Sequence, residues 1–111
     1  MDLTNQSVAF YIRGETPRTI NKQYLTLQQF CYDYQVAYAD VIVLKDIVKS
    51  DAPRPSLQSI LDGSTKVDVL VVQSYHILHI DHDQFLNISE QLLKHGVSLL
   101  IINEREAGEA I

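Results

Sequence analysis

Histidine side chains in the second half of the chain have the type and the spacing for metal binding. His76, His79 and His82 recur at three-residue intervals. If this stretch is helical, His76 and His79 share one face of the helix. Glu15, on a loop after the first apolar segment, would complete a set of two histidines and one carboxylate, which resembles a facial metal triad. No second metal-binding motif and no cysteine pair supports this site, so a solvated turn is the alternative, and we expect no metal and no cofactor.

Two arginines and two carboxylates form a second set of groups that could do chemistry: Arg13, Arg54, Glu15 and Asp46. A guanidinium group binds a carboxylate through two parallel hydrogen bonds. We expect Glu15 to form an ion pair with Arg13 or Arg54, and Asp46 can pair with one of the same arginines. Such ion pairs would stabilise the fold and take no part in a reaction. Structural ion pairs can resemble the charged groups of an active site.

Apolar runs and helical periodicity predict the elements that position these residues. A stripe of apolar side chains at three- and four-residue spacing predicts a helix over residues 22–35. Ser56 is suited to cap a short helix that ends at Gly63. Residues 14–21 and 45–55 are expected to be loops, the second because Pro53 and Pro55 interrupt regular structure. The stripe consists of Tyr24, Leu27, Cys31 and Tyr34, the last helix is expected at residues 83–95, and the strands are expected at residues 7–12, 40–44, 67–73 and 97–102.

Alternation of strands and helices predicts an α/β fold. We expect a three-layer sandwich with a mainly parallel sheet of four strands, or slightly more, covered by helices on both faces. Functional groups in such a sheet gather at the carboxyl ends of the strands. Those ends are residues 13–16, 45–46, 74–79 and 103–104.

Length and charge limit the classes of protein that this chain can be. Its 111 residues fit one domain, residues 1–111. No apolar run is long enough to span a bilayer and the first residues do not resemble a signal peptide. A single cysteine, Cys31, suits a reducing compartment, so we expect a cytoplasmic protein. The net charge of −5, from 14 acidic and nine basic residues, argues against direct DNA binding by this chain, because basic side chains drive that binding.

Several motifs resemble the N-terminal catalytic domain of the serine recombinases, the resolvase/invertase family. Tyr11 and Arg13 match the Tyr-x-Arg of that family at the end of the first strand. Asp46 matches an acidic residue after the second strand, and Arg54 opens an Arg-Pro-x-Leu segment. The resemblance covers residues 6–104 and implies a resolvase catalytic-domain-like fold. The family normally continues into a long helix and a DNA-binding domain, and we expect no DNA-binding domain within residues 1–111.

The departures from the family pattern fall on its chemistry. Glu15 stands where the resemblance places the serine that attacks DNA phosphate. Tyr75 and His76 stand for an Asp-Arg pair, and His79 stands for the arginine that follows it. Of the arginines that the resemblance places around the phosphate, two are present in this chain, Arg13 and Arg54. A carboxylate cannot replace the nucleophilic hydroxyl, and phosphoryl transfer depends on positive charge around the phosphate.

These observations predict a catalytically inactive recombinase-like domain that serves as an interaction or regulatory module. Its expected partner is another protein, either a second copy or an active relative. One alternative is a recombinase that still exchanges DNA strands through Tyr11, Arg13, Asp46 and Arg54. The other is a binder of a small anion or a metal at the altered pocket.

Overall fold

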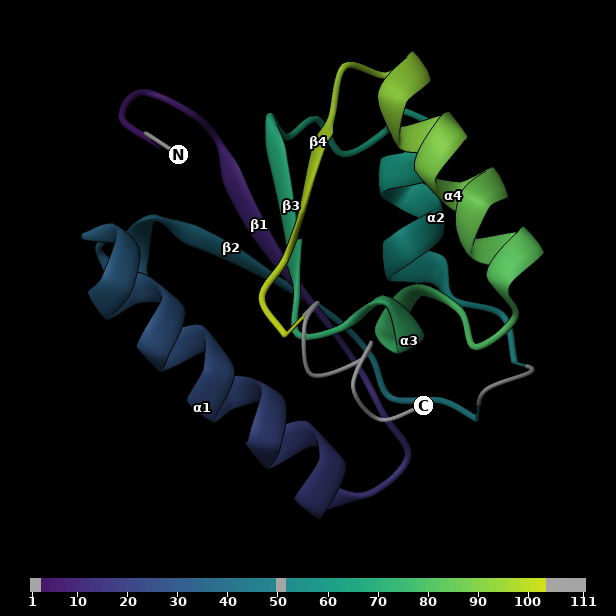
Figure 1. Cartoon of the computed structure of the whole chain (residues 1–111), viewed down its shortest axis with the longest axis horizontal. Helices are drawn as coiled ribbons and strands as arrows, with labels where there is room; N and C mark the ends of the chain where they lie inside the picture. Colours follow the sequence, from purple (N-terminus) through teal and green to yellow (C-terminus); the bar gives the residue numbers. More distant parts are fainter. Residues whose placement is uncertain (1–2, 50–51, 104–111) are drawn as a thin grey trace.

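The computed structural model describes residues 3–49 and 52–103 and contains a four-stranded, all-parallel sheet (Figure 1). The strands lie in the order β2-β1-β3-β4. This arrangement confirms the predicted α/β class with a parallel sheet. The elements in chain order are β1 (Val8–Arg13), α1 (Pro17–Tyr34), the 3₁₀ helix η1 (Tyr38–Asp40), β2 (Val41–Asp46), α2 (Pro55–Leu61), β3 (Val69–Val72), α3 (Tyr75–Leu78), α4 (His82–Lys94) and β4 (Ser98–Ile101).

Helices cover both faces of the sheet (Figure 1). Helix α1 packs alone on one face, and α2, α3 and α4 pack on the other. Side chains of β1 alternate between the two cores because successive residues of a strand point to opposite faces. On the α1 side the core contains Phe10, Ile12, Ile20, Leu27, Phe30 and Val71, and on the other side it contains Tyr11, Leu57, Ile60, Leu70, Leu78 and Leu92. Among the described residues, no helix combines the length and apolar character needed to cross a bilayer.

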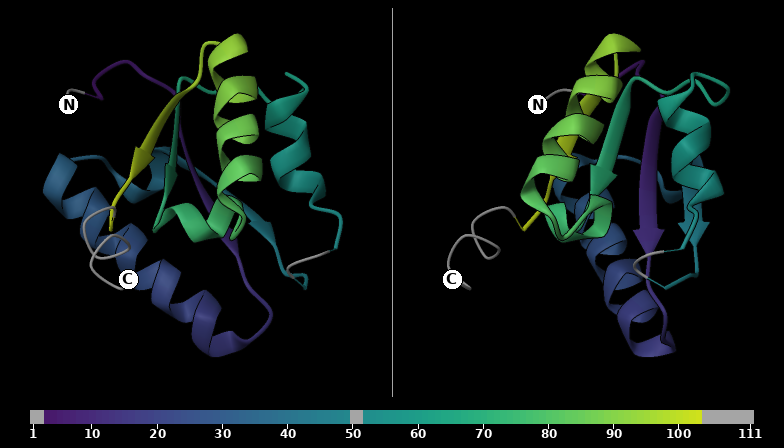
Figure 2. Two further views of the ribbon diagram at one scale, coloured as in Figure 1. Left: turned by 45° about the vertical axis from the view of Figure 1, so that its right-hand side comes forward. Right: turned by 90° about the vertical axis from the view of Figure 1, so that its right-hand side faces the viewer.

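The parallel register brings the ends of β1 and β2 together. Val8 pairs with Val41 at the start of the two strands, and Arg13 pairs with Asp46 at their end. All four strands run in the same direction (Figure 2). The loops that follow them therefore meet at one edge, the carboxyl edge of the sheet.

The first helix differs from the prediction in its start and in its buried face. It begins at Pro17, within the segment expected to be a loop. Thr16 caps it by accepting a hydrogen bond from the Thr19 amide, and proline is tolerated at the first helical position because its missing N–H would have no partner there. All four residues of the predicted stripe face the core: Leu27 is buried, and Tyr24, Cys31 and Tyr34 are partly buried and pack against the same cluster. The stripe is incomplete, because Ile20, Gln23 and Phe30 are the other buried side chains of α1.

The other predicted elements lie within about two residues of their predicted ends, and the 3₁₀ helix η1 was not predicted. Helix α2 begins one residue before Ser56, whose predicted role as the cap is wrong: Arg54 is at the capping position and makes no side-chain cap. Helix α3 was predicted only as an open possibility, and it forms as a single turn.

Gln23 is a buried polar side chain that ties α1 to the end of β1. Its Nε2 donates to the Arg13 carbonyl at 2.8 Å and to the Thr19 carbonyl at 3.1 Å. Its Oε1 accepts from the Arg13 amide at 3.1 Å. The side chain is fully buried, and these bonds give its polar atoms partners on the backbone. The amide therefore fixes the backbone of the residue that opens the carboxyl edge.

We expect Gln23→Ala to lower the free energy of unfolding by about 3 kcal/mol, because it removes three hydrogen bonds to the backbone and leaves a cavity in place of a buried side chain. Denaturant unfolding followed by circular dichroism measures the change. Gln28→Ala is the matched control: Gln28 is on the same helix but exposed, and its loss should change stability by less than about 0.5 kcal/mol. Equal stabilities for the two variants would contradict this role of Gln23.

Candidate functional site

Tyr11 and Asp46 form the buried centre of the carboxyl edge. Tyr11 is on β1 and Asp46 ends the neighbouring strand β2. The Tyr11 hydroxyl donates to Asp46 Oδ2 at 2.7 Å, and both residues are buried. The sequence resemblance placed both residues in one site, and the structure brings them into contact.

The Asp46 carboxylate also caps helix α2 from the adjacent strand. Its Oδ1 accepts from the Ser56 amide and its Oδ2 accepts from the Leu57 amide, each at 3.0 Å. These amides belong to the first turn of α2, where N–H groups have no partner within the helix. A carboxylate at this position also interacts favourably with the positive end of the helix dipole. The Asp46 carboxylate is thus bonded to a hydroxyl and two amides, and within the described residues it does not pair with an arginine as the alternative had it.

The environment of Tyr11 favours its neutral form. Burial raises the pKa of its hydroxyl strongly, because a phenolate loses its hydration there. The hydrogen bond to Asp46 and the negative charge of that carboxylate raise the pKa further, while the charges of Arg54 and Arg13 act in the opposite direction. Tyr11 is therefore a hydrogen-bond donor near neutral pH and is unsuited to act as an anionic nucleophile or base.

Arg13 is held by the loop that follows β2. Its Nη2 donates to the Val48 carbonyl at 3.1 Å. Its Nε is buried and has no hydrogen-bond partner within the described part of the chain. Gln23 holds its backbone from α1. Sequence analysis missed Gln23, although a polar residue at the spacing of Ile20, Leu27 and Phe30 was the available signal.

Arg54 connects the start of α2 to the end of α3. Its Nη1 donates to the carbonyls of Ile77 and Leu78. These carbonyls belong to the last residues of α3, which have no partners within so short a helix. A positive charge at a helix end is favourable as well. The guanidinium group therefore acts as a cap for α3.

Glu15 lies at the same edge but joins no network. It is exposed, two residues beyond the end of β1. Within the described residues it forms no hydrogen bond or ion pair, so the predicted pair with Arg13 or Arg54 is not formed. The structural reason is that Val48 holds the Arg13 guanidinium group and the end of α3 holds that of Arg54.

The histidines do not assemble the hypothesised metal triad. Helix α3 ends at Leu78, and His79 has an extended backbone. His79 Nδ1 accepts from the Asp81 amide at 3.0 Å, whereas His76 is exposed and its ring contacts that of Tyr75 at a tilt of 36°, with ring centres 4.1 Å apart. The described ranges contain no group of three His, Cys, Asp or Glu side chains placed to hold a metal. Glu15, His76 and His79 are therefore not a metal site in this structure.

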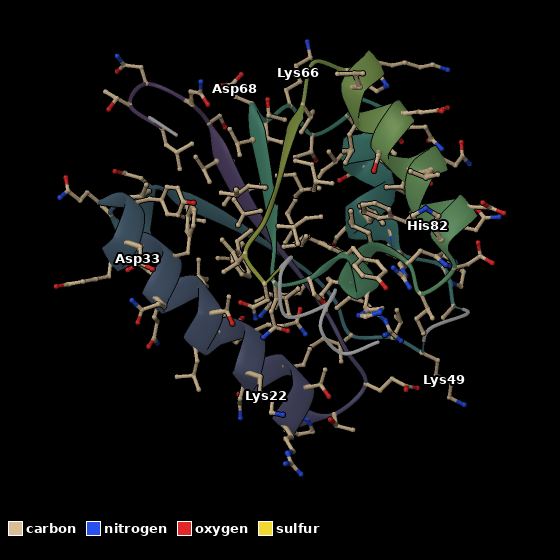
Figure 3. The ribbon with its side chains drawn as sticks, viewed as in Figure 1. Lys22, Asp33, Lys49, Lys66, Asp68 and His82 are labelled. Carbon is tan, nitrogen blue, oxygen red and sulfur yellow. The ribbon has the colours of Figure 1, made fainter. Side chains whose placement is uncertain are left out.

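Besides Arg13 and Arg54, two lysines lie toward the carboxyl edge of the sheet (Figure 3). Lys22 and Lys49 lie at this end of the molecule, and Lys66 and Asp68 lie at the opposite end (Figure 3). Tyr75 is part of the same edge, where its ring contacts Phe85 edge-on at 5.6 Å between centres. Of the predicted site residues, Tyr11 and Asp46 are in contact. The other predicted site residues lie around the edge. Arg13, Arg54 and His79 have separate partners, and Tyr75 and His76 contact each other.

Sequence comparison assigns the chain to a family. The family described as "Resolvase, N terminal domain" matches residues 8–110. The protein belongs to this family. The match includes both the Tyr11–Asp46 contact and the elements that Arg54 connects.

Solved serine recombinases share the fold of this resolvase-family domain. The C-terminal catalytic domain of ISC1926 TnpA, an IS607-like serine recombinase, has a TM-score of 0.69 at 20% identity, with 86% of this chain and 69% of that chain covered. The corresponding domain of IS1535 TnpA has a TM-score of 0.69 at 19% identity, covering 86% and 70%. A serine recombinase from Sulfolobus solfataricus has a TM-score of 0.64 at 17% identity, covering 90% and 70%. No curated protein sequence matches significantly. Structural likeness at these identities establishes the fold alone.

We expect Asp46→Ala to lower the free energy of unfolding by about 3 kcal/mol, because the Tyr11 hydroxyl and two amides of α2 lose their acceptor. Asp46→Asn keeps one oxygen acceptor of the same shape and should cost less than Asp46→Ala. Thermal and denaturant unfolding measure both variants. A stability of Asp46→Ala within about 0.5 kcal/mol of the native protein would show that the carboxylate does not hold these elements together.

Tyr11→Phe tests the raised pKa of Tyr11 through the pH dependence of stability. The folded-state pKa exceeds the unfolded value of about 10, so the native protein loses stability as pH rises above that value, by up to about 1.4 kcal/mol per pH unit. Phenylalanine does not titrate. The stability gap between the native protein and Tyr11→Phe should therefore narrow above about pH 10. A constant gap from neutral to strongly alkaline pH, measured by urea unfolding, would contradict the assignment.

Proposed function

We propose that this resolvase-family domain is catalytically inactive and acts as an interaction or regulatory module. The observation that carries the proposal is Glu15, an exposed carboxylate at the position where the family resemblance places the nucleophilic serine. A carboxylate at this position repels the DNA phosphate that a nucleophile must reach. A serine hydroxyl becomes a nucleophile when a base removes its proton, and a glutamate carboxylate has no hydroxyl group to be activated in this way.

The bonding of the matching residues supports the same proposal. Asp46 caps α2, Arg54 caps α3, and the Arg13 guanidinium group donates to the Val48 carbonyl. Each of these side chains therefore contributes to the stability of the fold independently of any reaction. The positions of two further family arginines are occupied by His76 and His79, which do not converge with them.

Binding of a small anion at the carboxyl edge is a second proposal. One observation favours it: Arg13 Nε is buried and has no hydrogen-bond partner among the described residues. A buried N–H group without a hydrogen-bond partner destabilises the folded protein, and an anion bound there would accept its hydrogen bond. A ligand that binds only the folded state raises its stability, so a phosphate titration of the melting temperature separates this proposal from the first.

The test of inactivity is incubation of the purified chain with supercoiled plasmid at low salt, with an active serine recombinase as the positive control. We expect no nicking, no relaxation and no protein–DNA adduct on denaturing gels. Glu15→Ser should remain inactive because the two histidine positions still lack arginine. Covalent attachment of the native chain to cleaved DNA would overturn the proposal, and would support strand exchange through Tyr11, Arg13, Asp46 and Arg54.

A further inference from the structure

The side of α1 that faces away from the sheet is uncovered. Among the described elements α1 lies alone on its face of the sheet, so one side of the helix packs on the strands and the other side faces outward (Figures 1 and 2). The outward residues are all exposed, and we call them the outer strip of α1. They are Arg18, Asn21, Lys22, Leu25, Gln28, Gln29, Tyr32 and Asp33.

Two large apolar side chains lie on one line along the outer strip. Leu25 is 65% exposed and Tyr32 is 82% exposed. They are separated by about two helical turns, as are Arg18 and Leu25, so the three side chains follow one another along the helix. Single exposed apolar residues are common on protein surfaces. A row with this spacing is instead the pattern by which two helices pack side by side.

The charges of the outer strip are divided between its two ends. Arg18 and Lys22 lie in the first half of α1 and Asp33 lies near its end, and Figure 3 labels Lys22 and Asp33 toward opposite ends of the helix. Within the described residues, the side chains of Arg18 and Lys22 make no ion pair or hydrogen bond. Asp33 accepts one hydrogen bond, from Gln29 Nε2 at 2.8 Å, and a carboxylate has further acceptor sites. The strip is therefore basic at its start and acidic at its end, with charges available to a partner.

Two copies of the outer strip are complementary when their α1 helices are antiparallel. A two-fold axis beside Leu25 places Arg18 of one copy opposite Tyr32 of the other, because these residues are equally far from Leu25 along the helix. The guanidinium group can then bind the tyrosine ring and the neighbouring Asp33 carboxylate. Symmetry repeats this contact on the other side of the axis, and the two Leu25 side chains meet between the two contacts.

Other ways of pairing two copies bring like charges together. Parallel α1 helices would place Arg18 against Arg18 of the second copy. Helix α4 also exposes two leucines, Leu86 at 46% and Leu93 at 76%, but a two-fold axis that matches these leucines brings the Glu90 side chains of the two copies together. The chain has a net charge of −5, so two copies repel each other in general. The outer strip of α1 is a face on which this repulsion is replaced by attraction.

We propose that two copies of this chain associate through the outer strips of α1, packed antiparallel about Leu25. The contact consists of one helix against one helix, which is small for a protein interface, so the dimer is weak and reversible. This proposal rests on the proposed function as an interaction module, since it identifies the partner as a second copy and names the surface.

Sedimentation equilibrium of the full chain tests the proposal, with loading concentrations from about 5 to about 500 µM because a small interface implies a micromolar dissociation constant. We expect a monomer–dimer equilibrium. Leu25→Glu should raise the dissociation constant at least about tenfold, because it places two carboxylates together at the axis. Leu93→Glu is the matched control, since it makes the same change of charge at an exposed leucine of α4, on the other face of the sheet. It should change the dissociation constant less than about twofold.

A charge exchange tests the antiparallel orientation. Arg18→Glu places a carboxylate opposite Asp33 of the second copy, and Asp33→Arg places a guanidinium group opposite Arg18 of the second copy. Each single substitution should raise the dissociation constant at least about fivefold. The variant with both substitutions restores opposite charges without a change of net charge, and it should dimerise within about twofold of the native chain. All the replaced side chains are exposed, and circular dichroism verifies that the variants fold.

Several results would overturn the proposal. One is a chain that stays monomeric throughout the concentration range. Another is a dimer that Leu93→Glu weakens and Leu25→Glu does not, and a third is a charge-exchanged double variant as weak as the single variants. A monomeric chain that co-sediments with vesicles of anionic phospholipid, and no longer does so after Leu25→Glu, would show that the strip binds a membrane instead.

Failure of this proposal and failure of the proposed function have different results. A chain that cleaves plasmid loses its assignment as an inactive module whether or not it dimerises through α1. A chain that leaves plasmid intact and stays monomeric keeps that assignment, and only the partner and the surface are wrong.

Discussion

The Asp46 carboxylate is the interaction on which the arrangement of the carboxyl edge depends. Through three hydrogen bonds it joins the buried hydroxyl of β1 to the first turn of α2. Its own backbone belongs to β2, so one side chain fixes two strands and a helix. Arg54 then extends the connection from α2 to the end of α3. Charge-assisted bonds to amides in a buried setting are among the stronger hydrogen bonds of a protein, which explains how loops without regular structure keep a defined position.

The residues that the sequence resemblance matches to the family hold separate elements together. Tyr11, Asp46 and Arg54 each bridge two elements. Of the residues that depart from the resemblance, Glu15 and His76 are exposed, whereas Tyr75 contacts Phe85 of α4 and His79 accepts a hydrogen bond from the Asp81 amide. A residue that holds the fold is costly to change even when catalysis is lost, whereas an exposed residue without partners changes at little cost. Retained Tyr, Asp and Arg residues are therefore weak evidence of activity in this domain.

The pattern of apolar residues along the sequence was sufficient to predict the strands of the sheet, but it did not predict the side-chain contacts of the candidate site. Buried parallel strands are continuous apolar runs, so their positions follow from the sequence alone. Gln23 escaped prediction because its partner is backbone ten residues earlier, outside any helical period. The Glu15 ion pair was inferred from nearness along the chain, but a carbonyl from the loop after β2 holds the Arg13 side chain instead. The metal hypothesis needed α3 to continue through His79, and the helix stops where Arg54 binds its last carbonyls.

Arg54 links the start of α2 to the end of α3, since its guanidinium group binds the last two carbonyls of α3. A guanidinium group oriented by two carbonyls has already lost much of its conformational freedom when the protein folds. The network around Asp46 and Arg54 therefore fixes the position of the Arg54 guanidinium group as well as the ends of α2 and α3.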